Sequence, residues 1–157
     1  MLFLIAIYAF AIIAANLIVA YFGPIASIYN SFFLIGLDLA LRNYLSCKLD
    51  KRQMLMMIVG TGLLSYLINP ASGMIAIASC VAFVLASLVD WIVFNTATGN
   101  WFKRNFFGNS AGALIDSIVF PTIAFGGLMP AIVAAQFAAK VLGGTLWGYL
   151  IKKRFNV

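Results

Sequence analysis

Apolar stretches long enough to cross a lipid bilayer follow one another along almost the whole chain. A transmembrane helix needs about 20 predominantly apolar residues. Six segments approach that length: residues 2–22, 28–47, 54–68, 71–95, 106–127 and 130–151. Of the 157 residues, 64% are hydrophobic and 9% are charged, and the mean hydropathy is +1.07. This composition excludes a water-soluble globule and predicts an all-α integral membrane protein, with six transmembrane helices in one domain over residues 1–157.

Eight of the ten basic residues lie in three short clusters, which follow the second, fourth and sixth apolar segments. The clusters consist of Lys48, Lys51, Arg52, Lys103, Arg104, Lys152, Lys153 and Arg154. With six crossings all three clusters reach the same membrane face, and the positive-inside rule identifies that face as cytoplasmic. Both termini are therefore expected in the cytoplasm. The net charge of +6 reflects this topology, so we expect no nucleic acid as a partner.

Five charged residues lie inside the predicted helices, where an unpaired charge is costly. Asp38, Asp116 and Lys140 lie at a common depth of about 15–18 Å from the basic ends of their helices. Arg42 and Asp90 lie at a shallower depth of about 8–9 Å. Three aspartates against two cations favour a polar central cavity, in which the odd carboxylate meets solvent or a ligand. The alternative is a set of buried ion pairs that only fixes the packing of the helices.

Two uncharged polar residues add to this pattern. Gln136 lies one helical turn before Lys140 and would add an amide to the cavity. Asn16 would serve either the cavity or a hydrogen bond between helices. The last segment also has small residues at every fourth position: Ala131, Ala135, Ala139 and Gly143. This small-residue stripe predicts a close helix contact, within the chain or between the protomers of a homodimer.

Several classes of function do not fit the sequence. It contains no histidine, no set of residues with metal-ligand spacing and no evident nucleophile beside a base, so we expect no metal, no cofactor and no enzymatic activity. No helix has the continuous polar stripe of a channel. A carrier for a small molecule in the lipid bilayer remains. Since the chain lacks a Gly-x-x-x-x-Gly-Lys phosphate loop, it would work alone or as the substrate-binding subunit of an importer with a separate ATPase, docked on Ala11 and Ala15.

Short motifs along nearly the whole chain resemble those of the queuosine precursor transporters, also called the vitamin uptake transporter (VUT) family. The motifs are AANLIV around Asn16, FFLIGLDLALR around Asp38 and Arg42, ASLVDWIVFN around Asp90, Arg104-Asn105, LIDSIVFPTIAFGG around Asp116 and AAKVL around Lys140. The resemblance implies a multi-pass carrier that imports a 7-deazaguanine base, the cyano or aminomethyl precursor of queuosine, across the bacterial cytoplasmic membrane. It also implies that Asn16, Asp38, Arg42, Asp90, Asp116 and Lys140 line or support the binding site.

The chain departs from the family pattern in the two turns before Asp116. Gly108-Asn109 and Gly112-Ala113 stand where the family has Ser-Thr and Ser-Gln or Ser-Asn. These changes remove hydrogen-bonding groups from the neighbourhood of the predicted cavity.

A guanine-like base also suits the charged residues on chemical grounds. It offers adjacent N–H donors that one carboxylate accepts together, and its carbonyl oxygen needs a donor. We expect Asp38 or Asp116 to accept the N–H groups. Arg42, Lys140 or Gln136 would donate to the carbonyl oxygen.

Overall fold

The computed structural model of the chain describes residues 2–68 and 74–156, and every regular element in these ranges is a helix. The elements are α1 (Leu2–Phe22), α2 (Pro24–Asn30), the π-helical turn η1 (Ser31–Ile35), α3 (Gly36–Ser46), α4 (Lys51–Ile68), α5 (Met74–Thr96), α6 (Trp101–Ala124) and α7 (Pro130–Phe155). Because α2, η1 and α3 follow one another without a break, they form one crossing. The predicted all-α class is confirmed. The start of the fourth predicted segment, residues 71–73, lies outside the described residues.

The helices begin and end where local chemistry allows. α6 starts at Trp101, before the predicted residue 106, because the side chain of Asn100 caps it by accepting the backbone N–H of Lys103 at 2.9 Å. α2 starts at Pro24 directly after Gly23, whose φ of 76° is easily reached only by glycine. α4 and α7 also extend beyond the predicted apolar segments, since they include flanking basic residues.

The distribution of side chains is that of a membrane protein. Five described helical stretches are long and apolar enough to span a bilayer: Leu2–Phe22, Ile25–Ser46, Ile77–Thr96, Trp101–Ala124 and Pro130–Phe155. The remaining long helix, α4, has 18 residues and includes basic residues in its first turn, and its role as a sixth crossing stays a prediction. Large apolar side chains such as those of Phe10, Leu67 and Leu142 are exposed, whereas four charged side chains are buried: Asp38, Arg42, Asp90 and Lys140. This pattern is the reverse of that in soluble proteins, so the chain is a multi-pass membrane protein.

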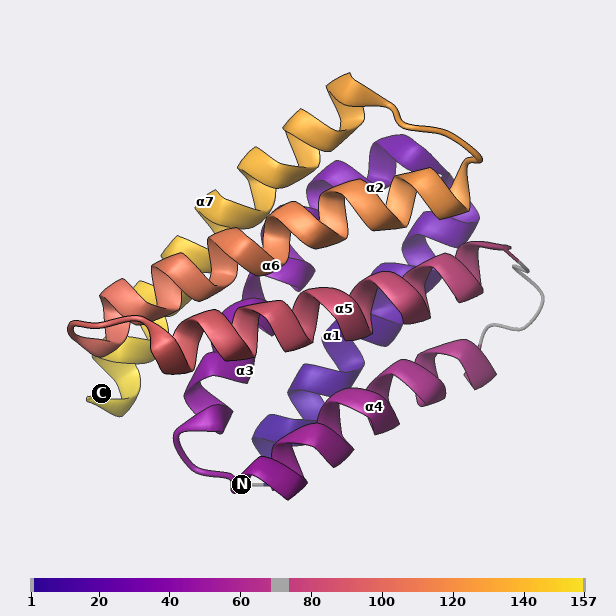
Figure 1. Cartoon of the computed structure of the whole chain (residues 1–157). Coiled ribbons are helices and arrows are strands. Elements are labelled where there is room, and N and C mark those ends of the chain that lie inside the picture. Colours follow the sequence, from indigo (N-terminus) through magenta and orange to yellow (C-terminus); the bar gives the residue numbers. More distant parts are fainter. Residues whose placement is uncertain (1, 69–73, 157) are drawn as a thin grey trace.

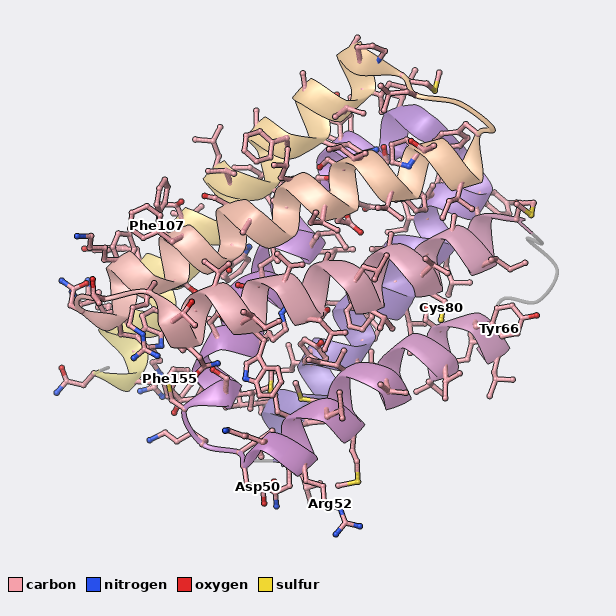
Figure 2. All side chains as sticks on the ribbon, in the orientation of Figure 1. Asp50, Arg52, Tyr66, Cys80, Phe107 and Phe155 are labelled. Atoms are coloured by element: carbon pink, nitrogen blue, oxygen red, sulfur yellow. The ribbon has the colours of Figure 1, made fainter. Side chains whose placement is uncertain are left out.

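The helices form one bundle with both termini at the same end (Figure 1). The α3–α4 and α5–α6 connections also lie at that end, which therefore carries the three basic clusters and is called the basic end below. The α1–α2 and α6–α7 connections lie at the opposite end. Figure 2 shows Asp50 and Arg52 where α4 begins, at the basic end, and Tyr66 near the far end of the same helix. The shared end of the termini and the basic clusters is as predicted from the charges, and its cytoplasmic location stays a prediction.

Buried apolar residues form two clusters along the bundle. The larger cluster joins α1, α3, α4, α5 and α7 and contains Tyr8, Leu45, Met54, Ile58 and Ile151 among others. The smaller cluster, nearer the end opposite the basic end, contains Val19, Ala78, Ala82 and Phe120. Polar residues occupy the interior between these clusters, so the centre of the bundle is the place to look for a site.

The π-helical turn η1 lies in a tight contact with α7. A Cβ atom on Gly143 would collide with the carbonyl group of Phe32, and one on Gly36 would lie 2.6 Å from the carbonyl carbon of Gly143. The indole N–H of Trp147 donates to the carbonyl of Phe33 at 3.0 Å. Gly143 of the small-residue stripe thus serves a contact inside the chain. A homodimer through the small-residue stripe stays a prediction. Its interface would have to use the alanines of the stripe.

Candidate functional site

A cavity of about 50 Å³ lies in the middle of the bundle, enclosed by residues from α1, α2, η1, α3, α5, α6 and α7. Six of the seven predicted site residues line it: Asn16, Asp38, Arg42, Asp116, Gln136 and Lys140. They come from helices that are far apart in sequence, and the fold brings them together. The cavity is large enough for a few water molecules but well below the roughly 300–1,000 Å³ of typical ligand pockets. The cavity as described is therefore too small to hold a drug-sized ligand.

Lys140 has a complete set of partners. Its Nζ lies 2.7 Å from Asp116 Oδ2 and donates to Ser117 Oγ and Gln136 Oε1 at 3.0 Å each. These contacts use all three donors of an ammonium group. Gln136 in turn donates its Nε2 to Ser27 Oγ at 2.8 Å. The equal depth predicted for Asp116 and Lys140 thus corresponds to an ion pair that ties α6 to α7, and the Asp116 side chain is 19% exposed.

Arg42 lies between two aspartates, and its contacts are unequal. Nε donates to Asp90 Oδ2 at 2.8 Å, and Nη1 donates to Ser87 Oγ. Nη2 lies 3.7 Å from Asp38 Oδ2, which is too long for a hydrogen bond. Among the described residues, neither Arg42 Nη2 nor Asp38 Oδ1 has a hydrogen-bond partner, although both atoms are buried. The odd carboxylate expected from the charge count is therefore that of Asp38.

Asp90, the seventh predicted residue, lies behind Arg42 and outside the lining that the described residues form. Its Oδ1 accepts from Asn43 Nδ2 at 3.0 Å. The same amide lies 2.9 Å from Asn109 Oδ1 and 3.3 Å from Asn105 Oδ1. All three asparagines are buried. We refer to Asn43, Asn105 and Asn109 as the asparagine cluster. The asparagine cluster holds the Asp90 carboxylate, and Asp90 in turn holds the Arg42 guanidinium on the side away from the cavity.

The asparagine cluster was missed by sequence reasoning, although one signal was present. Asn105 and Asn109 are spaced i, i+4 in an apolar helix and therefore share a face. Asn43 directly follows Arg42 in the sequence. Such a pair of amides on one face is a sign of a polar contact between helices.

Asn16 takes the helix-to-helix role that was one of its two expectations. Its Nδ2 donates to Ser65 Oγ, and its Oδ1 accepts from Ser79 Oγ. These bonds join α1 to α4 and α5 at the wall of the cavity. Nearby, Asn30 donates its Nδ2 to the carbonyl of Ala15 at 2.9 Å. The amide groups on this side of the cavity therefore support the wall.

Gly108 and Gly112, the two glycines in the turns before Asp116, face α5. A Cβ atom on Gly108 would collide with Asp90 Oδ1 and lie 3.1 Å from the Asp90 carbonyl oxygen. A Cβ atom on Gly112 would lie 2.8 Å from Asp90 Cβ and 3.0 Å from the Ala86 carbonyl oxygen. In this chain both positions permit a close approach of α5 and α6 beside Asp90. Asn109, the neighbour of Gly108, supplies hydrogen bonds in the same turn.

Comparison with known proteins identifies a family for nearly the whole chain. The family described as "Putative vitamin uptake transporter" matches residues 2–152. No curated protein and no solved structure matches the chain.

Proposed function

Because this chain belongs to the vitamin uptake transporter family and is a multi-pass membrane transporter, we propose that it imports a queuosine precursor, a 7-deazaguanine base, as a stand-alone secondary carrier. The site of import would be the bacterial cytoplasmic membrane, with the basic end in the cytoplasm. The imported base would supply the salvage of queuosine for tRNA. The family resemblance of the motifs around Asp38, Asp116 and Lys140 supports this choice of substrate.

The cavity is the observation that carries the proposal. A planar, polar base needs a few well-placed donors and acceptors inside apolar walls. The cavity offers two carboxylates and two cations, and Phe83 and Phe120 contribute apolar wall. Since the cavity volume is only about 50 Å³, the base would enter after the helices part, and closure around it would separate the two membrane faces.

Uptake by liposomes that contain only this purified chain tests the proposal. We expect saturable uptake of the radiolabelled aminomethyl 7-deazaguanine base, with little uptake by empty liposomes. Asp116→Asn should reduce uptake at least about tenfold, since it removes one of the charged groups of the cavity. Asp50→Asn is the matched control, because Asp50 is exposed at the start of α4, where asparagine caps a helix equally well. Absence of both binding and uptake would refute the proposed substrate.

The alternative is a substrate-binding subunit that needs a separate ATPase. Its expected docking face is not available, since Ala11 and Ala15 are 1% and 3% exposed inside the bundle. Binding of the base without uptake by liposomes would nevertheless favour this alternative. In that case, liposomes that also contain the ATPase partner should take up the base.

A further inference from the structure

We propose that Asp38 and Arg42 together recognise a lactam edge of the ligand, which is a ring N–H next to a ring C=O. The inference rests on the proposed function, because it assumes that the cavity binds a heterocyclic base. It selects one acceptor and one donor from the five candidates that the chemistry of a guanine-like base leaves open.

The hydrogen bonds already made in the cavity distinguish the candidates. Lys140 uses its three donors on Asp116, Ser117 and Gln136. Gln136 donates to Ser27 and accepts from Lys140. Asp116 is held by Lys140 at 2.7 Å. Lys140 would have to give up a bond before donating to a ligand, whereas Asp116 and Gln136 keep a further acceptor or donor position but are already held by their present bonds.

Asp38 Oδ1 and Arg42 Nη2 have no such bond to lose. Among the described residues, both atoms are buried without a hydrogen-bond partner, and both side chains line the cavity. A buried polar atom without a partner is unfavourable, so a ligand that supplies the partner gains the full benefit of the new bond. The vacant acceptor and the vacant donor are therefore the strongest recognition groups in the cavity.

The positions of the two groups define the edge that fits them. Asp38 and Arg42 are spaced i, i+4, and Asp38 Oδ2 lies 3.7 Å from Arg42 Nη2. Asp90 and Ser87 hold the other side of the guanidinium, so Nη2 is oriented before the ligand arrives. An ionised carboxylate only accepts hydrogen bonds, and a guanidinium only donates them. The matching ligand edge therefore has one donor beside one acceptor, as in a lactam.

This arrangement differs from capture of the base by a single carboxylate. In that case the ring N–H and the exocyclic amino group of the base would both donate to one aspartate, and loss of the amino group would be costly. Recognition of the lactam by Asp38 and Arg42 instead leaves the amino group with a minor role. A series of bases that differ at these two places distinguishes the two arrangements.

Titration calorimetry of the purified chain in detergent provides the test. We expect 7-deazahypoxanthine, which keeps the lactam and lacks the amino group, to bind within about fivefold of 7-deazaguanine. The 6-O-methyl derivative of 7-deazaguanine, which lacks the lactam N–H, should bind about 10- to 100-fold more weakly, as expected for lost hydrogen bonds to charged groups. Two results would overturn the inference while the proposed function stands. One is that the 6-O-methyl derivative binds as tightly as 7-deazaguanine, and the other is that 7-deazahypoxanthine, without the amino group, does not bind.

Variants of the two residues provide a second readout. Asp38→Asn and Arg42→Lys should reduce the preference for 7-deazaguanine over its 6-O-methyl derivative by about tenfold or more. Asp50→Asn, the matched control, should leave that preference unchanged. An unchanged preference in a folded Asp38→Asn variant would overturn the inference. If the parent chain binds neither these three bases nor the aminomethyl 7-deazaguanine base, the proposed function fails, and the inference fails with it.

Discussion

The two buried cations of the cavity are held in different ways. Lys140 is bonded to Asp116, Ser117 and Gln136 at 2.7–3.0 Å, so its bonding capacity is filled. Arg42 is bonded on one side to Asp90 and on the other side only approaches Asp38, at 3.7 Å. Both belong to ion pairs inside a membrane bundle, so pairing alone does not separate structural from functional charges. Under the proposed recognition of a lactam edge, the vacant hydrogen-bonding positions separate them.

Removal of the arginine should have the largest effect on stability. Arg42→Met leaves Asp38 and Asp90 buried without their common cation, and breaking a buried pair in this way costs about 3–5 kcal/mol. Thermal unfolding in detergent should show a large decrease in the midpoint. Arg52→Met is the matched control, because Arg52 is exposed in the first turn of α4 (Figure 2) and should change stability by less than about 0.5 kcal/mol. Equal midpoints for the two variants would contradict the pairing described for Arg42.

A substitution behind Asp90, on the side of Arg42 away from the cavity, should have the next largest effect on stability. Gly108→Ala places a methyl group against Asp90, which must shift and loosen its contact with Arg42. Overpacking of this kind costs about 1–3 kcal/mol. Gly60→Ala is the control, since nothing lies within 4 Å of a Cβ atom there, and should stabilise α4 by about 0.5–1 kcal/mol. The same thermal unfolding experiment measures both, and a neutral Gly108→Ala would be inconsistent with the close α5–α6 contact.

The lysine side of the comparison should be more tolerant. Asp116→Asn removes the charged partner of Lys140 but leaves two neutral acceptors at 3.0 Å, Ser117 and Gln136. The Asp116 side chain is 19% exposed, so the expected loss is about 1–2 kcal/mol, lower than for a fully buried pair. Chemical unfolding in detergent would measure it. A loss as large as that of Arg42→Met would show that Lys140 depends on Asp116 more than the structure indicates.

The smallest change in stability is expected at Asp38. Asp38→Asn removes a charge whose Oδ1 has no hydrogen-bond partner among the described residues and whose Oδ2 contact is long, so stability should change by less than about 1 kcal/mol. Binding of 7-deazaguanine should nevertheless decrease more than in any of the glycine variants. Parallel unfolding and calorimetry would measure both effects. A large loss of stability at Asp38 would place this residue with the structural charges.

Much of the fold followed from the sequence because length and charge are both explicit there. The apolar segments and the three basic clusters are compatible with only a few arrangements of the helices across the membrane. Asp116 and Lys140, which were placed at the same depth, form an ion pair. Arg42 and Asp90, which share the shallower depth, also form a pair. The asparagine cluster was harder to predict. Most of these helices are apolar around their whole circumference, so their sequences do not indicate which face points inward. The contact of Asn43 with Asn109 depends on this rotation and appears only when the helices are packed.

The π-helical turn at Ser31–Ile35 affects how relatives of this chain should be aligned. Its hydrogen bonds run from i to i+5, so it accommodates one residue more than an α-helical turn does. Deletion of a residue there would restore α-helical bonding and leave Ser27 and Asp38 on their present faces. The same deletion within α3 would rotate the following side chains by about 100°. We therefore expect relatives with a one-residue gap inside this transmembrane helix, and an alignment that forbids gaps there would pair the wrong residues on one side of the turn.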